Sequence, residues 1–271
     1  MQKYSRNQRV AVITRILTEH PNRIVSLNYF SELFNAAKST ISEDILIIRE
    51  SLDKQGEGMV ETIAGVSGGV KYRIRVPETR KEVFKEEIVR YLSDPSRIIP
   101  GNFLYVTDLM MNPRIVREAG AILAEKFQDT GADYVITVET KGIPLAYEVA
   151  RCLGVSLIVV RRNTKITEGT AVSINYLTGN QGMLSVMSLA KRSLKPGSRL
   201  VFIDDFLRGG GTVKGIIDLL HEFDSSLGGV GVMIASREQS DKVIPVTLVN
   251  LCDFYGVEEN MKINIKSSNS L

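Results

Sequence analysis

Apolar residues in the first part of the chain recur three or four positions apart, which is the spacing of one helix face. This pattern predicts helices over residues 6–20, 27–34 and about 40–55, with Pro21 ending the first. Thr40 and Glu43 have the spacing of a capping box, in which a hydroxyl and a carboxylate satisfy end amides reciprocally. We therefore expect three short helices, the third beginning at this capping box.

A different pattern, the alternation of polar and apolar residues, follows the third helix. Residues 59–63 and 70–76 flank a glycine-rich turn, and Lys71, Arg73 and Arg75 alternate with three apolar residues along the second segment. The two segments predict a hairpin with one basic and one apolar face. Three helices followed by such a hairpin predict a winged-helix domain over residues 1–77.

The third helix begins with short hydroxyl residues and a cation, which suit contacts with phosphates and with base edges in a major groove. The basic row of the hairpin would lie along a phosphate backbone. We therefore predict DNA contacts by Lys38, Ser39, Thr40, Ser42, Arg49, Lys71, Arg73 and Arg75. Each element also has a purely structural interpretation, because a capped helix can serve packing alone and a cationic strand can protect a sheet edge. The order of the elements favours DNA binding.

The pattern changes again after a polar stretch that begins at Pro77, and we place the start of a second domain, residues 78–271, there. Helical stretches are predicted at residues 113–128, 144–153 and 211–223. They alternate with apolar runs at residues 134–138, 156–160, 200–203 and 230–234. Alternation of this kind predicts an α/β domain with a parallel sheet.

One strand end in this domain carries the most informative residues of the chain. Asp204 and Asp205 follow the apolar run 200–203, and three glycines and Thr212 then open a helix. Glycines let the backbone approach a ligand, and a helix amino terminus favours an anion, so this segment predicts a phosphate cradle. The two carboxylates would repel phosphate and are expected to bind sugar hydroxyls or to act through a metal ion. Neither a Walker A string nor a dinucleotide fingerprint is present.

This segment resembles the 13-residue signature of the phosphoribosyltransferases, in which four apolar residues precede two acids and a loop of small residues. The resemblance implies that Asp204 and Asp205 hold the ribose hydroxyls of 5-phosphoribosyl 1-pyrophosphate and that residues 208–212 hold its 5′-phosphate. Residues 139–142 are similar to the pyrophosphate loop of that family, and Arg161 lies at a cationic strand end. The implied effector contacts are Asp204, Asp205, Phe206, Leu207, Arg208, Gly209, Gly210, Gly211, Thr212, Thr140, Lys141, Gly142 and Arg161.

Arg208 departs from the pattern of the enzymes, many of which have a hydroxyl residue, alanine or an acid there. An arginine is permanently charged and cannot accept a proton, so a general-base role at this position is lost. We therefore predict ligand binding without catalysis and assign no catalytic residue.

A winged helix joined to such a domain resembles the purine operon regulators of Gram-positive bacteria. The segments that carry this resemblance are residues 38–44, 67–72, 140–145, 167–173 and 204–212. It implies a homodimeric DNA-binding protein, repressor or activator of purine biosynthesis genes, that senses 5-phosphoribosyl 1-pyrophosphate. Two alternatives stay open: an active purine phosphoribosyltransferase with an accessory DNA-binding domain, and a regulator whose pocket is vestigial.

The distribution of charge does not establish a polyanion partner but indicates where one would bind. Residues 1–77 hold eleven Lys and Arg against eight Asp and Glu, and the rest hold twenty-three of each, so the net charge of +3 lies in the first domain. No stretch approaches the ~20 apolar residues of a membrane span, and we expect a cytoplasmic protein without a membrane partner. Cys152 and Cys252 lie in apolar surroundings and are expected to be buried, inert thiols. We expect no resident metal and no obligatory cofactor, although Mg²⁺ could accompany the effector.

Overall fold

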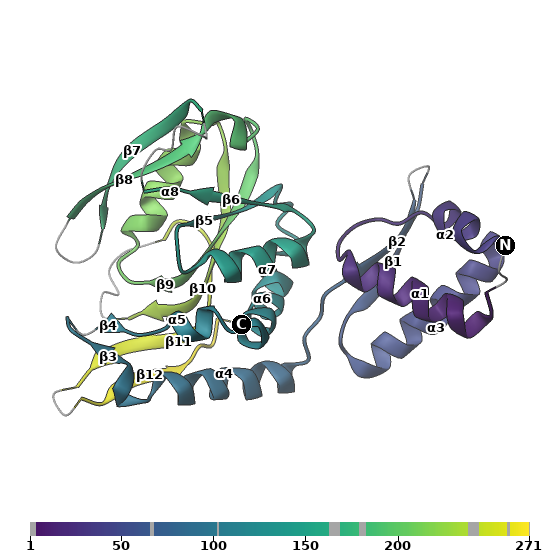
Figure 1. The fold of residues 1–271 in the computed structure, drawn as a ribbon, viewed down its shortest axis with the longest axis horizontal. Helices are drawn as coiled ribbons and strands as arrows, with labels where there is room; N and C mark the ends of the chain where they lie inside the picture. The colour runs from purple at the N-terminus through teal and green to yellow at the C-terminus, as the bar shows by residue number, and fades with distance from the viewer. Residues whose placement is uncertain are drawn as a thin grey trace. The chain divides into compact units, whose positions relative to one another are not determined.

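The computed structural model describes residues 4–65, 68–101, 103–162, 169–178, 183–237, 244–258 and 261–270 (Figure 1). The chain divides into two compact units. The first comprises Met1–Glu78 together with Arg151–Gly154, and the second comprises Thr79–Ala150 together with Val155–Leu271.

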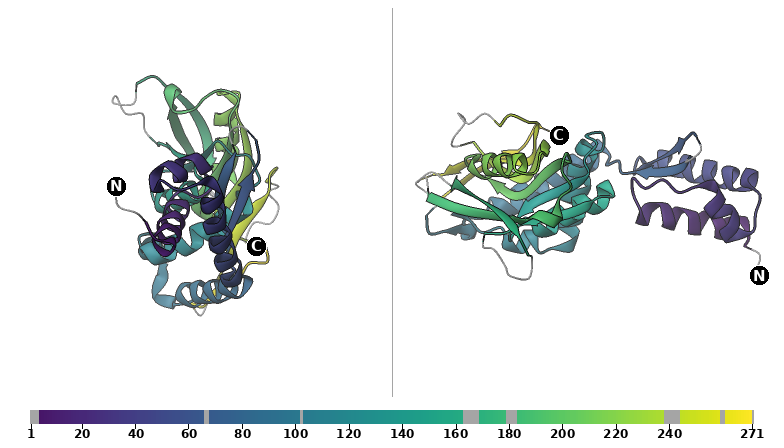
Figure 2. Two further views of the ribbon diagram at one scale, coloured as in Figure 1. Left: turned by 90° about the vertical axis from the view of Figure 1, so that its right-hand side faces the viewer. Right: turned by 90° about the horizontal axis from the view of Figure 1, so that it is seen from above.

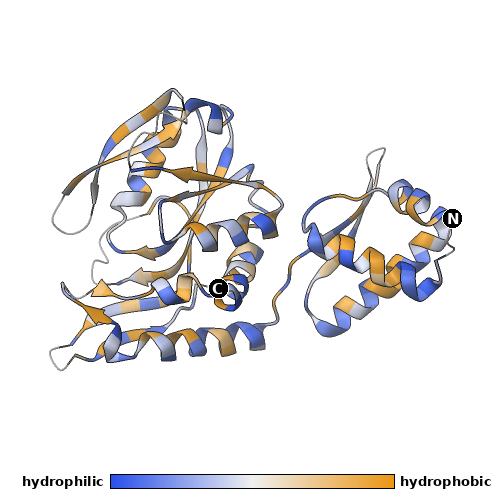
Figure 3. Cartoon of the chain, viewed as in Figure 1, coloured by the Kyte–Doolittle hydropathy of each residue, from blue (hydrophilic) through white to orange (hydrophobic). Residues whose placement is uncertain are grey.

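The first unit has the predicted order of three helices and a hairpin. Its elements are α1 (Arg6–Glu19), α2 (Leu27–Phe34), α3 (Lys38–Gln55), β1 (Met59–Ile63) and β2 (Gly69–Arg73), and the two strands are antiparallel. Apolar side chains from all five elements form one core, which includes Ile13, Phe30, Ile45 and Tyr72. The hydropathy colours of Figure 3 show polar and apolar positions on different sides of these helices. The predicted winged-helix architecture is confirmed.

The capping box predicted at the start of α3 is wrong. The helix begins two residues earlier, at Lys38, and its N-cap residue Ala37 makes no side-chain hydrogen bond. The chain leaves α2 through Asn35, which adopts a left-handed conformation, and re-enters a helix at once, so Thr40 lies inside the first turn. A capping box is present instead at α1, where Ser5 and Gln8 bond to each other's backbone amides.

A buried ion cluster holds α3 against α1. The side chain of Asp44 on α3 is 0% exposed, and its two oxygens accept hydrogen bonds of 2.6 and 3.3 Å from the guanidinium of Arg9. Arg6 lies 3.5 Å from the same carboxylate. A carboxylate buried in this way is stable only when it is paired, so the cluster fixes the position of α3 on α1.

The second unit is built on one sheet. Among the described residues the strand order is β12-β11-β10-β9-β5-β6. The strands are β5 (Tyr134–Val138), β6 (Ser156–Val160), β9 (Arg199–Leu207), β10 (Ser226–Ser236), β11 (Leu248–Val257) and β12 (Ile263–Ser267). All neighbours run parallel except β12, which is antiparallel to β11. The predicted α/β class is confirmed, with one antiparallel edge strand added.

Helices cover both faces of this sheet (Figure 2). They are α4 (Glu78–Leu92), α5 (Thr107–Met110), α6 (Pro113–Phe127), α7 (Ile143–Leu153) and α8 (Gly211–His221). Alternate residues of β10 face opposite sides: Val230 and Val232 lie in the cluster around α8, whereas Gly229 and Gly231 lie against Phe127 of α6. Two short hairpins were not predicted, β3 (Ile98–Ile99) with β4 (Phe103–Leu104) and β7 (Ala171–Thr178) with β8 (Met183–Ala190).

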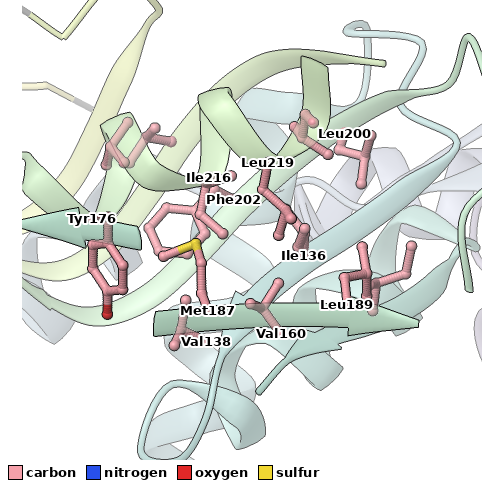
Figure 4. Packing of buried hydrophobic residues seen from close by; sticks show 14 of the residues in the cluster. Ile136, Val138, Val160, Tyr176, Met187, Leu189, Leu200, Phe202, Ile216 and Leu219 are labelled. Atoms are coloured by element: carbon pink, nitrogen blue, oxygen red, sulfur yellow. The ribbon is translucent and has the colours of Figure 1, made fainter. Parts of the chain in front are cut away.

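The β7–β8 hairpin and α8 enclose the main core of this unit. Figure 4 shows Ile216 and Leu219 of α8 beside Phe202 of β9, with Met187 of β8 close by. Gly215 makes the contact between helix and hairpin possible, because a Cβ there would lie 2.9 Å from Tyr176 Cβ and from Met187 Cε. The side chains of Tyr176 and Met187 therefore pack directly on the backbone of α8 at Gly215.

The order of the strands reverses between β5 and β9. From β5 the chain passes through α7 to β6 on one side, and from β9 it passes through α8 to β10 on the other. The pairing of β5 with β9 ends at Ile136 and Phe202, beyond which the two strands are not paired with each other. In open parallel sheets, ligands bind at the carboxyl ends of strands at such a reversal.

Both cysteines are buried and free, as predicted. Burial raises the pKa of the Cys252 thiol to about 12, so it stays protonated. No helix in the described part of the chain combines the length and the apolar character needed to span a membrane.

Candidate functional site

The glycine-rich turn is shorter than predicted, because β9 does not end at Ile203. It continues through the two aspartates to Leu207 and stays paired with β10. The side chain of Leu207 belongs to the buried core, and the ring of Phe206 packs edge-on against Phe254. Leu207 and Phe206 were both predicted to contact the effector. In the structure they lie in β9, and their side chains pack against other parts of the second unit.

The turn itself, residues 208–210, leads directly into α8. Gly210 is the N-cap residue, and its φ of 73° lies in the left-handed region that favours glycine. No side chain caps the helix, so the amides of Gly211 and Thr212 in its first turn have no intrahelical acceptor. These amides and the helix dipole offer hydrogen-bond donors and partial positive charge to an anion; binding of a phosphate by residues 208–212 stays a prediction.

The two aspartates lie beside this turn. The amide of Asp205 donates to Asp204 Oδ1 at 2.9 Å. Burial, followed by the negative charge of Asp205, raises the pKa of the Asp204 carboxyl well above its ordinary value. A ligand that supplies hydrogen-bond donors or positive charge at this position would stabilise the ionised carboxylate.

The loop after β5 comes directly against Asp204. Gly142 is buried, and a Cβ on it would overlap Asp204 Oδ1 and lie 3.0 Å from Asp204 Cα. Thr140 and Lys141 are exposed, and the peptide bond between Glu139 and Thr140 is cis. Two segments that are distant in the sequence thus meet at the reversal of strand order, and only a residue without a side chain fits between them.

Arg161, at the end of β6, is tied to the same loop. Its guanidinium lies 3.1 Å from Glu139 Oε2, and the amide of Arg162 donates to Glu139 Oε1 at 2.7 Å. The geometry makes Arg161 a support for residues 139–142. The basic sequence that follows, residues 163–165, lies outside the described residues.

Arg208 stacks on aromatic rings. Its guanidinium carbon lies 4.3 Å from the ring centroid of Phe103 on β4 and 5.9 Å from that of Phe206. These are cation–π contacts, which hold the arginine at the edge of the turn.

Two residues near the site were missed. Thr137 of β5 is 0% exposed, and its hydroxyl is the one buried side-chain polar atom in the described chain without a hydrogen-bond partner. A threonine inside an apolar run was the signal. Burial of Tyr176 on β7 raises the pKa of its phenol. The positive charge of Arg162 lowers that pKa, and the negative charge of Asp204 raises it. Because β7 was not predicted, the sequence analysis gave no indication that Tyr176 lies near the site.

On the first unit, the beginning of α3 presents the predicted polar residues. Lys38, Ser39 and Ser42 are exposed and Thr40 is half-buried. Ser42 Oγ donates to the carbonyl of Lys38 at 2.9 Å. Arg49 is different, because its guanidinium donates to Val60 O at 3.0 Å and to Thr62 Oγ1 at 2.7 Å. It joins α3 to β1, a structural role that the sequence did not indicate.

The basic row of the hairpin is partly neutralised. Glu61 on β1 lies 3.6 Å from Lys71 Nζ and 3.2 Å from Arg73 Nη1. The side chains of these three residues are only 26%, 23% and 18% exposed. Arg75 lies beyond the end of β2 and is exposed. The expected row of three equivalent cations is therefore two cations that share a carboxylate and one that lies outside the strand.

Among the residues that the structure describes, no group of three or more His, Cys, Asp or Glu could hold a metal ion. An ion at the aspartates would need most of its ligands from a bound molecule and from water, which is how Mg²⁺ usually binds with phosphates.

Comparison with known proteins gives a match in each unit. The family described as "Bacterial purine repressor, N-terminal" matches residues 5–74, and "Phosphoribosyl transferase domain" matches residues 106–257. The chain is 39% identical over 263 residues to the purine biosynthesis transcriptional repressor PurR of Bacillus subtilis, covering 96% of this chain and 92% of that one. It is 38% identical to the purine biosynthesis transcriptional activator PurR of Lactococcus lactis, covering 88% of each.

Enzymes also match part of the chain. A xanthine phosphoribosyltransferase of Streptococcus thermophilus is 31% identical over 159 residues, or 57% of this chain and 82% of that one. A crystal structure of adenine phosphoribosyltransferase from Rhodothermus marinus has a TM-score of 0.53 at 22% identity and covers 64% of this chain and 98% of that one. This structural likeness shows the fold.

Proposed function

The chain belongs to the PurR family of purine biosynthesis regulators, as its sequence resemblance predicted, and from this premise we propose that it controls transcription in response to 5-phosphoribosyl 1-pyrophosphate. The first unit binds DNA, and the effector binds where the strand order of the second unit reverses. The family contains both a repressor and an activator, so either sign of regulation is compatible with this function.

The observation that carries the proposal is the convergence of two loops on Asp204. The turn 208–210 supplies amides at the start of α8, and the loop 139–142 packs against the carboxylate through Gly142. Phosphate at the first place and pyrophosphate at the second would leave a ribose between them, beside Asp204 and Asp205. A sugar carrying phosphates at both ends would use both kinds of group, the amides and cation for its phosphates and the carboxylates for its hydroxyls.

Each group of residues then has one task. The amides of Gly211 and Thr212 bind the 5′-phosphate, and the carboxylates of Asp204 and Asp205 accept hydrogen bonds from the ribose hydroxyls. Lys141 supplies charge for the pyrophosphate, and Arg161 holds the loop through Glu139. Mg²⁺ bound to the pyrophosphate would reduce its charge, and the carboxylates of Asp204 and Asp205 are the residues that would hold it.

The DNA surface is the exposed start of α3. Lys38 and Ser39 lie in its first turn, where a recognition helix contacts base edges and phosphates. A homodimer would present two such helices to two half-sites of an operator.

The two sites are coupled through free energy. An effector that changes DNA affinity tenfold must itself bind the DNA-bound and the free protein with affinities that differ tenfold, or about 1.4 kcal/mol. The coupling can therefore be measured either as the effect of the effector on DNA affinity or as the effect of DNA on effector affinity.

A titration tests the proposal. Fluorescence anisotropy of a labelled operator duplex is measured with and without 5-phosphoribosyl 1-pyrophosphate and Mg²⁺. We expect the effector to change the affinity, and the double variant Asp204→Ala, Asp205→Ala to bind DNA normally without responding. Asp218→Ala, which removes an exposed carboxylate from α8, is the control that should respond like the natural protein. An operator affinity indifferent to the effector would overturn the proposal.

The similarity to xanthine phosphoribosyltransferase favours a second candidate, an active transferase. We propose that the chain is not an enzyme, because Arg208 cannot act as a general base and stacks on Phe103. Purified protein given the effector, Mg²⁺ and each purine base in turn should release no pyrophosphate. Turnover with any base would establish the enzyme instead.

A further inference from the structure

Thr137 has a hydroxyl that the free protein does not use. It lies near the end of β5, one residue beyond the last pair that joins β5 to β9. The residue is 0% exposed, and Oγ1 has no hydrogen-bond partner among the residues that the structure describes. A buried hydroxyl without a partner destabilises the fold, so a valine of almost the same shape would make the fold more stable.

The position of the hydroxyl points to a partner. A Cβ built on Gly142 would lie 3.0 Å from Thr137 Oγ1 and would overlap Asp204 Oδ1. The two oxygens therefore border the same space beside the backbone of Gly142. In the free protein Asp204 Oδ1 accepts its hydrogen bond from the amide of Asp205 instead.

We propose that Thr137 is a positioning residue for Asp204: when the effector's ribose hydroxyls engage the carboxylate, the Thr137 hydroxyl donates a hydrogen bond to it and fixes its orientation. The inference rests on the proposed function, since it needs an effector at Asp204. It adds a residue from β5 to a site formed by the end of β9 and two loops, and it explains a polar group at a place where the fold alone favours an apolar one.

The proposal gives one substitution two effects of opposite sign. Thr137→Val removes the hydroxyl and keeps the shape, so the melting temperature of the full chain should rise by at least about 2 °C. The dissociation constant for 5-phosphoribosyl 1-pyrophosphate with Mg²⁺, measured by calorimetry, should rise about tenfold or more because a hydrogen bond to a charged group is lost. Thr137→Ser keeps the hydroxyl and should bind the effector like the natural protein.

A control compares Thr137 with a threonine that is exposed and whose hydroxyl already has a hydrogen-bond partner. Thr62 Oγ1 on β1 accepts a hydrogen bond of 2.7 Å from Arg49, so Thr62→Val should not raise the melting temperature.

Several outcomes would overturn the inference. Unchanged effector affinity in Thr137→Val would show that the hydroxyl does not act on the ligand. A lower melting temperature in that variant would show that the hydroxyl already has a partner in the free protein. Equal losses of affinity in the valine and serine variants would assign the effect to packing. If the natural protein itself gives no heat with the effector, the proposed function fails, and this inference fails with it.

Discussion

Replacing Glu61 by glutamine should make the protein bind DNA more tightly and less selectively. Glu61 lies directly opposite Lys71 in the hairpin and is ion-paired with both Lys71 and Arg73. A phosphate that binds either cation must compete with this carboxylate. Glu61 therefore weakens contacts that carry no sequence information and leaves the discrimination to α3.

The expected magnitude follows from two terms. An ion pair of this kind contributes up to about 1 kcal/mol, so its removal can raise affinity for random DNA by up to about fivefold for each cation released. Each additional phosphate contact steepens the slope of log K against log salt by about 0.9. One or two new contacts would enlarge the loss of affinity between 50 and 200 mM salt by about 3- to 12-fold.

The assay is anisotropy with an operator duplex and a random duplex of the same length, at several salt concentrations. Glu61→Gln should bind the random duplex more tightly, with a steeper salt dependence and a smaller ratio of specific to random affinity. Glu19→Gln is the matched control, because it removes the same charge from an ion pair with Arg15 on α1. If Glu61→Gln behaves like Glu19→Gln on the random duplex, the hairpin does not contact the phosphate backbone.

Other predictions concern both units. Asp44→Ala should destabilise the first unit by about 3–5 kcal/mol, because it leaves Arg9 without its partner, and denaturation followed by circular dichroism would measure this. Ser39→Ala should reduce the preference for operator over random DNA, whereas Lys71→Ala should weaken binding to both; equal losses from both variants would refute the placement of α3 in the groove. Gly142→Ala should abolish effector binding in calorimetry and leave DNA binding intact, since its Cβ displaces the Asp204 carboxylate. The raised pKa of Asp204 contributes stability that is complete below the ordinary aspartate pKa of about 3.9 and is lost as pH rises through the folded-state value. Asp204→Asn should therefore melt at a higher temperature than the natural protein at pH 7, with the difference shrinking towards pH 4; parallel melting curves across pH would contradict the raised pKa.

Elements with a clean apolar pattern were predictable. β5 and β6 occur with the predicted bounds, and α6, α7 and α8 differ from the prediction by one or two residues at one end. Each of these strands is a short apolar run, and each of these helices has one apolar face, so the local sequence is enough to predict their type and bounds. β11 escaped prediction because Asn250 and Asp253 interrupt its apolar run. Both are buried, and Asn250 Nδ2 donates to Asp253 Oδ1 at 2.9 Å, a pairing visible only after folding.

The candidate site was predictable in composition and less so in geometry. The aspartates and glycines identify a ligand class, but charged residues usually leave a strand, so the continuation of β9 to Leu207 was not expected. The partners of Arg49, Lys71 and Arg161 depend on strand register and on contacts between distant segments. For this reason the sequence predicted that these three cations would contact a ligand or DNA. In the structure Arg49 donates to a carbonyl and a hydroxyl, and Lys71 and Arg161 are each paired with a carboxylate.

The close seat of the β7–β8 hairpin on Gly215 has a consequence for motion. Because side chains of the hairpin, those of Tyr176 and Met187, pack directly on the backbone of α8 at Gly215, neither element can shift far without moving the other. Their backbone amides should consequently open to solvent together, and hydrogen exchange should give the two elements a common protection factor. A ligand that settles at the start of α8 would then slow exchange in β7 as well, although β7 follows a different loop of the chain.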